Sequence, residues 1–331
     1  CRKVLIDSKP KDLLPDWLRF LKGVIDSADL PLNISRESMQ DSALVQKINK
    51  VITKRLLKFL DKESKKNKDL YKEFWGEFGI FLKEGVTSDF THKEQISKLI
   101  RFESSFTEKG ELTSFEEYVT RMKEEQKEIY YLYGASRETI EAGPYVEAFK
   151  ARQLEVIYLY EQIDEFVMNN LFEFDKKSLK SADADEINLD KVEDEEGVES
   201  LDETEVKDLI TWIKSTLGDK VSEVETSDRL IGSPACLLTT ENGMTANMRK
   251  VMKAMKQDTG MPDSAPKFQI NAKHDLIKDL SKLYQSNQDT AQLILEQILD
   301  NTFVTSGILE DPREMLERNY RILQSLAKQS L

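Results

Sequence analysis

Two short apolar runs with a helix between them constrain the fold of this chain more than any other feature. The runs are Ile129–Tyr133 and Val156–Tyr160, and the helix predicted between them covers Pro144–Arg152. A strand, a helix and a strand within about thirty residues are typical of a βαβ unit, whose two strands pair in parallel. The sequence therefore predicts an α/β arrangement for most of the first half of the chain.

Other helices and strands are predicted on both sides of this unit from periodicity and end signals. Apolar residues from Leu44 to Phe59 follow helical spacing, and Ser114 and Glu117 have the spacing of a capping box that starts a helix ending near Glu128. The remaining predicted elements are a strand at Arg2–Ile6, a short helix at Pro15–Phe20, a helix at Asp69–Phe78, a helix at Glu203–Leu217, strands at Val221–Thr226 and Ala235–Thr240, and a helix at Glu241–Lys256.

The last third of the chain gives the clearest helical signal. Two predicted helices each carry a continuous apolar stripe, formed by Ile294, Leu295, Ile298, Leu299 and Phe303 in the first helix and by Met315, Leu316, Tyr320 and Leu323 in the second. Two helices do not easily bury both stripes alone, so pairing with a second copy in a four-helix bundle is one solution. Docking of both stripes onto the preceding α/β layer is the alternative.

An acidic segment separates the two halves of the sequence. Residues 182–199 contain nine carboxylates and few apolar side chains, which is typical of a linker or mobile loop. A cation site is the sharper alternative, but the spacing does not match an EF-hand loop. We therefore expect domains at 1–181 and 200–331, joined by the linker 182–199.

The composition excludes several classes of function. A net charge of −13 argues against binding to a phosphate backbone, and no apolar run approaches the length of a membrane span. The two cysteines, Cys1 and Cys236, are too few for a disulfide framework or a zinc site. We expect no metal site in this chain, no nucleic-acid partner and no membrane partner.

The sequence also lacks a complete active site. There is no Walker-type phosphate loop and no GxGxxG motif after a strand. The two histidines, His92 and His274, lie far apart in sequence and have no neighbours that indicate a catalytic triad. A self-contained hydrolase or metal enzyme is therefore not expected.

One arginine is nevertheless well placed to hold an anion. Ser35 is a good helix N-cap, so Arg36 falls in the first turn of a helix, beside unpaired backbone N–H groups. A guanidinium there offers a fork of charged donors to a phosphate. The simpler alternative is an ion pair between Arg36 and a nearby carboxylate, Glu37 or Asp41.

The sequence around Arg36 resembles a signature of the 90-kDa heat-shock chaperone family (Hsp90). That signature covers Gly23–Glu37. The likeness continues through Gln40–Ser42, Phe74–Trp75, Phe78–Gly79, Leu82–Gly85, Arg101–Ser105, Tyr118–Lys123, Ile129–Tyr131, Asp164–Glu165 and Glu173–Asp175. It spans essentially the whole chain, densely to about Asp175 and more loosely afterwards.

The resemblance implies a mixed α/β and α+β fold. A layered α/β/α middle domain would occupy 1–181, and a smaller α+β C-terminal domain ending in the dimerising helix pair would occupy 200–331. It also implies that an N-terminal ATP-binding domain is missing from this sequence. Arg36 and Gln40 match the residues that the family's middle domain extends to ATP, and Asn33 is a weaker candidate for positioning. The full-length protein is then expected to use ATP with Mg²⁺, whereas this chain alone would neither bind ATP well nor hydrolyse it.

A second implied surface binds unfolded or partly folded client proteins. In the C-terminal half it would use a methionine-rich helix face, Met244, Met248, Val251 and Met252, for which ordinary core packing is the alternative. In the first half the matching positions are Glu165, Phe166 and Asn169. Phe166 departs from the tryptophan of some bacterial members, which weakens that part of the match.

These implications lead to one functional hypothesis and one alternative. The hypothesis is that the full-length protein is a homodimeric, ATP-dependent stress-response chaperone. The alternative is an acidic dimeric scaffold or adaptor with no link to ATP. The final residues Leu326–Leu331 lack the acidic tail motif of cytosolic eukaryotic members, so partners that capture that tail are not expected. The bacterial cytoplasm is the expected location, and the mitochondrial matrix is the alternative.

Overall fold

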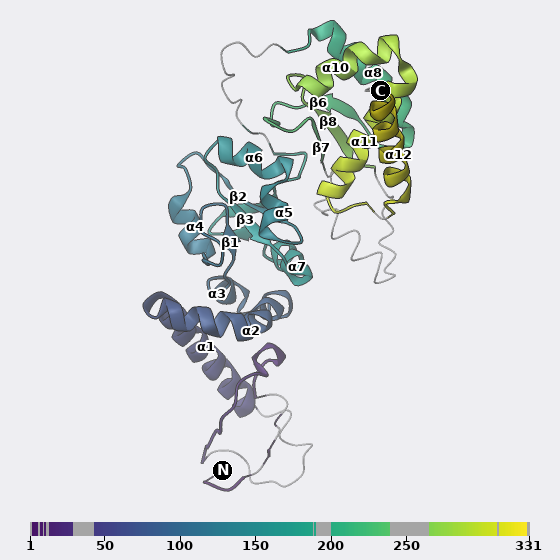
Figure 1. Cartoon of the computed structure of the whole chain (residues 1–331). Coiled ribbons are helices and arrows are strands. Elements are labelled where there is room, and N and C mark those ends of the chain that lie inside the picture. Colours follow the sequence, from purple (N-terminus) through teal and green to yellow (C-terminus); the bar gives the residue numbers. More distant parts are fainter. Residues whose placement is uncertain are drawn as a thin grey trace. The chain divides into compact units, whose positions relative to one another are not determined.

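The chain divides into two compact units in the computed structural model, shown in Figure 1. The structure describes residues 2–5, 7–8, 10, 13–28, 43–187, 189, 200–238, 265–309 and 311–329. Unit 1 comprises Cys1–Phe102, Leu112–Arg121 and Phe166–Lys177, and unit 2 comprises Glu103–Glu111, Met122–Glu165 and Ser178–Leu331. Helices and mixed sheets both occur, which confirms the predicted α/β and α+β fold class.

Unit 1 is mainly helical. Its elements are η1 (Asp16–Leu18), α1 (Ala43–Lys66), α2 (Lys68–Ser88), α3 (Lys93–Ser97), α4 (Phe115–Arg121), the end of α7 (Gln162–Leu171) and β4 (Glu173–Phe174). The short helix predicted after Pro15 is confirmed as η1, and the helix predicted at 69–78 is confirmed as part of the longer α2. None of the helices in the described part of the chain is long and apolar enough to cross a membrane.

Aromatic rings join the segment after η1 to α2. The Phe20 ring lies with its centroid 6.0 Å from that of Phe74, 4.9 Å from Phe78 and 5.3 Å from Phe81, three residues on one side of α2. The Arg19 guanidinium lies 4.4 Å from the Phe81 ring centroid and donates to Glu84 at 2.8 Å. Ring stacking and this charged hydrogen bond therefore fix the same short segment.

The helix predicted from Leu44 to Phe59 is confirmed as α1, but its buried face differs from the predicted apolar stripe. Val51 and Phe59 are exposed, whereas Thr53 and Ser64 are buried together with Leu57. Burial on a helix follows its angular position, and two small polar residues fit against the protein on that side. Spacing predicted the helix correctly, and it placed two apolar side chains on the wrong face.

Ser114 and Glu117 form the predicted capping box at the start of α4. The Ser114 hydroxyl accepts from the Glu117 backbone N–H at 3.2 Å, and the Glu117 carboxylate accepts from the Ser114 backbone N–H at 3.0 Å. The helix ends at Arg121 instead of near Glu128. The charged run 123–128 has no apolar side chain to bury, so nothing stabilises further helical turns there.

The strand predicted at Arg2–Ile6 is wrong for the residues that the structure describes. Arg2 and Lys3 have φ angles of 48° and 67°, which are turn conformations, and residues 2–5 contain no strand. A β-strand needs a neighbour to satisfy its backbone groups. No described strand pairs with this segment, so its apolar residues alone do not make it extended.

The first half of unit 2 contains the βαβ unit that the sequence predicts. Its elements are β1 (Glu103–Ser104), β2 (Glu128–Tyr133), α5 (Arg137–Glu141), α6 (Pro144–Ala151), β3 (Val156–Leu159) and β5 (Lys177–Ser181). Within unit 2 the strands lie in the order β1-β3-β2-β5, with β2 parallel to both β3 and β5 and with β1 antiparallel to β3. All four residues of β3 are buried, so this strand lies in the core.

The second half of unit 2 packs helices against a smaller sheet. Its elements are α8 (Glu203–Leu217), η2 (Gly218–Lys220), β6 (Val224–Thr226), β7 (Ala235–Leu238), β8 (Lys267–Ile270), α10 (Asp275–Ser286), α11 (Gln288–Thr305) and α12 (Arg313–Gln329). The sheet order is β6-β8-β7, and the buried core joins residues of α8, α10 and α11 to all three strands. The helix predicted at Glu203–Leu217 is confirmed as α8.

The first residues of the predicted acidic linker are part of unit 2. Ala182 and Ile187 belong to the buried core, and Asp185 forms an ion pair with Lys267 at 2.7 Å. Residue 188 and residues 190–199 lie outside the described residues. The linker 182–199, and the domain bounds on either side of it, stay a prediction.

We predict that Asp202→Ala will destabilise α8 by about 1 kcal/mol, because Asp202 caps this helix. Its carboxylate accepts from the backbone N–H groups of Thr204 at 2.9 Å and Glu205 at 2.8 Å, and its own N–H donates to the Glu205 side chain. Hydrogen exchange of the α8 amides should rise severalfold. Asp208→Ala, which removes an exposed carboxylate of the same helix, is the control, and equal exchange in the two variants would contradict this role.

Asp89 gives a prediction that depends on pH. Burial alone would raise the pKa of Asp89, but hydrogen bonds from His92 and from the Trp17 indole N–H outweigh burial and hold that pKa below its ordinary value. A lowered pKa in the folded state adds stability at neutral pH, and this contribution is lost as pH falls through that pKa. Asp89→Asn should therefore be less stable by about 1 kcal/mol at neutral pH.

The measurement is urea unfolding of both proteins, followed by tryptophan fluorescence. The difference in unfolding free energy should hold from about pH 7 to about pH 5 and should narrow below about pH 4. A difference that stays constant to about pH 3 would show that the Asp89 charge contributes nothing to stability.

Candidate functional site

Two of the predicted site groups lie outside the described residues. These are the nucleotide-facing residues Asn33, Arg36 and Gln40, and the methionine-rich face formed by Met244, Met248, Val251 and Met252. Their assignments therefore stay predictions. Within the described residues, no group of three or more His, Cys, Asp or Glu side chains has an arrangement that could hold a metal ion.

The predicted client-binding residues of α7 do not share one exposed surface. Glu165 is buried, Phe166 is half-buried and Asn169 is exposed. Phe166 and Asn169 are three residues apart, which places them on the same side of the helix. Of the three, these two are available to a partner, whereas the Glu165 side chain lies inside the protein.

The predicted dimerisation residues fall into two groups. Leu295, Ile298 and Leu299 lie in the core of unit 2, and Ile294 and Phe303 pack against that core. Their stripe on α11 is thus covered by the protomer itself, as the docking alternative expects. On α12, however, Met315 is half-buried and the side chains of Leu316, Tyr320 and Leu323 are between 47% and 68% exposed. We call Leu316, Tyr320 and Leu323 the α12 apolar row.

A buried arginine determines which side of α12 carries that row. Arg318 is 5% exposed, and its Nε donates to Glu296 of α11 at 2.9 Å, while a second guanidinium nitrogen pairs with Asp300 one turn further along α11. Arg318 stands two residues from both Leu316 and Tyr320. A step of two residues turns a helix by about 200°, so an inward Arg318 holds the apolar row on the outer side.

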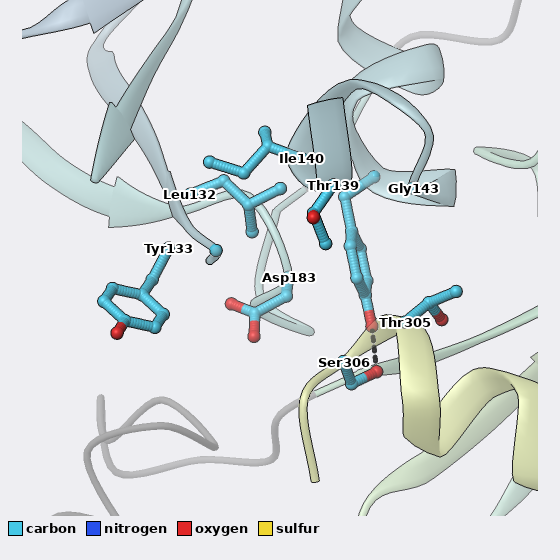
Figure 2. Close-up of a pocket in the computed structure, with 10 residues that line it drawn as sticks. Leu132, Tyr133, Thr139, Ile140, Gly143, Asp183, Thr305 and Ser306 are labelled. Atoms are coloured by element: carbon cyan, nitrogen blue, oxygen red, sulfur yellow. Dashed lines mark hydrogen bonds between the residues drawn. The ribbon is translucent and has the colours of Figure 1, made fainter. Parts of the chain in front are cut away.

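Unit 2 also contains a small cavity between α5–α6 and the C-terminal end of α11. Figure 2 shows Leu132, Thr139 and Ile140 on one side of it, Thr305 and Ser306 on the other, and the Asp183 carboxylate between them. Its volume is about 30 Å³, whereas sites for small ligands usually enclose about 300 to 1,000 Å³. The cavity has room for a few water molecules and is too small for a nucleotide.

Tyr145, which also lines this cavity, joins both halves of unit 2. Its hydroxyl donates to the Leu237 carbonyl of β7 at 2.6 Å and lies 2.9 Å from the Ser306 Oγ. Burial raises the pKa of the Tyr145 phenol well above its ordinary value, so the hydroxyl keeps its proton for this bond. Nearby, the Glu147 carboxylate accepts from the backbone N–H groups of Ile231 and Ser233 at 3.2 and 3.1 Å.

The remaining chemically reactive side chains have structural roles. Burial raises the pKa of the Cys236 thiol to about 12, which leaves it protonated and unreactive at neutral pH. The His274 ring accepts from the Leu276 backbone N–H at 3.0 Å and caps α10, and His92 pairs with Asp89 at 2.9 Å. Neither histidine forms a catalytic triad with the described residues.

Known proteins match this chain along nearly its whole length. The family model described as Hsp90 protein matches residues 1–330. Chaperone protein HtpG of Desulfitobacterium hafniense is 48% identical over 328 residues, which cover 98% of this chain and 52% of that protein. Chaperone protein HtpG of Desulfotalea psychrophila is 45% identical over 329 residues, which cover 98% and 53%.

A mitochondrial protein matches over the same extent. The mitochondrial heat shock protein 75 kDa of Bos taurus is 40% identical over 333 residues, which cover 97% of this chain and 47% of that protein. The chain thus spans about half the length of the curated relatives that it matches. These matches confirm the resemblance seen at residues 23–37, and the chain belongs to the Hsp90 family.

Proposed function

We propose that the full-length protein is an ATP-driven homodimeric chaperone of unfolded or partly folded proteins. In this proposal the chain supplies the contact between protomers, part of the client surface and an arginine that reaches ATP. Two of the relatives above are named chaperone proteins and one a heat shock protein, which supports this class of function. The observation that carries the proposal is the exposed α12 apolar row.

The α12 apolar row is the part of the predicted dimer contact that remains available to a second copy. Its side chains repeat at i, i+4 and i+7, so they form a ridge along one side of the helix. In a two-fold dimer the same patch is used on both protomers, which a single apolar ridge satisfies. In the proposed four-helix bundle, the α11 stripe would pack inside each protomer. The α12 apolar row would form the contact between the two protomers.

The proposed link to ATP depends on Arg36. Bound to an N-terminal domain of the full-length protein, ATP with Mg²⁺ would supply the energy for closing the dimer. The Arg36 guanidinium would offset negative charge that develops at the terminal phosphate, and Gln40 would hold the Arg36 loop by hydrogen bonding. Asn33 would help to position that loop. We expect no ATP turnover by this chain alone.

The proposed client surface combines exposed positions of α7 with the methionine-rich face. Phe166 and Asn169 support it because a partner is able to reach both. Flexible thioether side chains at Met244, Met248 and Met252, beside Val251, would suit many different client sequences. Glu165 would act indirectly, since its side chain is buried.

The proposed compartment is the bacterial cytoplasm. Two bacterial relatives are 45% and 48% identical to this chain, and the bovine mitochondrial relative is 40% identical. The mitochondrial matrix is the alternative.

We predict that replacing Leu316 and Leu323 together by serine will weaken dimerisation of this chain by about a hundredfold or more. Both side chains are exposed, so the protomer should keep its fold. Sedimentation equilibrium across protein concentrations measures the dissociation constant. Leu276→Ser, at an exposed leucine of α10, is the matched control and should leave dimerisation unchanged. A wild-type chain that stays monomeric, or a double variant that dimerises like wild type, would remove α12 as the contact.

We also predict that Arg36→Ala in the full-length protein will lower steady-state ATP turnover by about a hundredfold to a thousandfold. Binding of ATP should change little, because Arg36 acts on charge that develops during the reaction. Arg55→Ala, which removes an exposed arginine of α1, is the control. Unchanged turnover in Arg36→Ala, in a protein that still dimerises, would favour the acidic scaffold or adaptor instead.

A further inference from the structure

Two phenylalanines of unit 1 expose most of their surface and share one lysine. Phe90 is 76% exposed and Phe172 is 61% exposed. The Lys93 Nζ lies 6.0 Å from the Phe90 ring centroid and 5.3 Å from the Phe172 ring centroid. Residues 90 and 172 are distant in sequence, so the fold itself brings these side chains together. We call Phe90, Lys93 and Phe172 the Phe90–Phe172 patch.

A hydrogen bond holds Lys93 in place and leaves its ammonium group able to contact a partner. Its Nζ donates to the Asn170 carbonyl at 2.7 Å, in the last turn of α7, where the helix dipole favours a cation. The Asn170 side chain in turn donates to the Phe166 carbonyl at 2.9 Å. Among the residues that the structure describes, no carboxylate forms an ion pair with Lys93. An ammonium group uses one of its three donors on Asn170, so two remain.

Phe172 occupies a backbone conformation that favours glycine. Its φ is 45°, and its N–H donates to the Met168 carbonyl at 2.9 Å, so it caps α7 in the left-handed region. After two other helices the chain has glycine in this region, Gly218 at φ 56° and Gly307 at φ 68°, whereas after α6 it has Gln153 at φ 52°. A Cβ in this region approaches the following carbonyl oxygen, which strains the backbone. An exposed aromatic side chain at such a position does not stabilise the fold, so it is free to serve a partner.

We propose that the Phe90–Phe172 patch docks a polypeptide segment that carries an aliphatic or aromatic side chain beside a carboxylate. The two rings offer apolar surface to the first group, and Lys93 offers charge complementarity to the second. The patch lies at the C-terminal end of α7, the helix that also carries Phe166 and Asn169. The proposal rests on the chaperone function proposed above and names a class of client segment that it would hold.

The composition of the patch favours a peptide over other anionic partners. Nucleic acids need several cations in contact with successive phosphates, and the patch has one lysine. One lysine between two rings instead matches one carboxylate between apolar side chains. A peptide segment of mixed apolar and acidic character therefore fits best.

The test is peptide binding to the whole 331-residue chain, measured by fluorescence anisotropy. The probe is an unstructured peptide in which leucine and phenylalanine alternate with aspartate. Two comparison peptides replace every aspartate by lysine or every apolar residue by serine. The protein variants are Phe172→Gly, Phe90→Ser and Lys93→Gln, and Phe59→Ser is the control because Phe59 is an exposed phenylalanine of α1.

Phe172→Gly should weaken binding of the acidic apolar peptide by about tenfold, which is a substantial contribution for one side chain. Its thermal stability should stay equal to that of wild type or rise, because glycine adopts φ 45° without strain. Phe90→Ser should weaken binding similarly. Lys93→Gln should reduce the preference for the acidic over the basic peptide, and Phe59→Ser should change nothing.

Three outcomes would overturn the proposal, and they are separable from failure of the chaperone function. Unchanged peptide affinity in both phenylalanine variants would exclude the patch as the docking site. Equal affinity of wild type for acidic and basic peptides would exclude the role of Lys93. If the phenylalanine variants bind the peptide more weakly and also melt at a clearly lower temperature than wild type, then the patch has only a structural role. If wild type also fails to bind a chemically unfolded protein, then the proposed chaperone function itself is wrong.

Discussion

The buried ion pairs of Arg318 are the constraint on which the proposed dimer contact of this chain depends. Arg318 of α12 reaches Glu296 and Asp300 of α11 while its own side chain is almost fully buried. Removing one partner of a buried pair leaves an unpaired charge, which costs about 3 to 5 kcal/mol, so the helix rotation is strongly fixed. With Arg318 inward, Leu316, Tyr320 and Leu323 face outward. The polar contact inside the protomer thereby determines which apolar surface remains for a second copy.

In unit 1, hydrogen bonding likewise fixes a charged side chain, at the Phe90–Phe172 patch. The carbonyl at the end of α7 holds Lys93, and Lys93 in turn lies against two rings that remain exposed. In both units hydrogen bonds fix a charged side chain, but Lys93 lies against two exposed rings, whereas Arg318 lies on the opposite side of α12 from the apolar row. Tyr145, by contrast, has its hydroxyl satisfied inside unit 2, and the cavity beside it is too small for a ligand of ordinary size. Among the residues that the structure describes, the surfaces proposed for binding are therefore at a helix face and a helix end.

Local signals in the sequence predicted much of the fold. The βαβ unit, the capping box at Ser114 and the helix α8 depend on nearby residues, and all three occur. The strand expected at Arg2–Ile6 failed because pairing depends on distant residues. Periodicity does not say which stripe is covered by the same protomer, so the α11 and α12 stripes looked equivalent. The meeting of Phe90 with Phe172 has no signal in sequence spacing, although a phenylalanine directly after a helix is a local hint of strain.

Hydroxyl-radical footprinting of this chain across protein concentrations, read at Tyr320 and Leu323, tests whether the outer side of α12 joins two copies. If the outward face of α12 joins two copies, then oxidation of both side chains should fall as the dimer forms. Oxidation of Phe59, exposed on α1, should stay constant over the same range. Equal oxidation of Tyr320 and Leu323 at every concentration, in a chain that sedimentation shows to be dimeric, would place the contact between copies elsewhere.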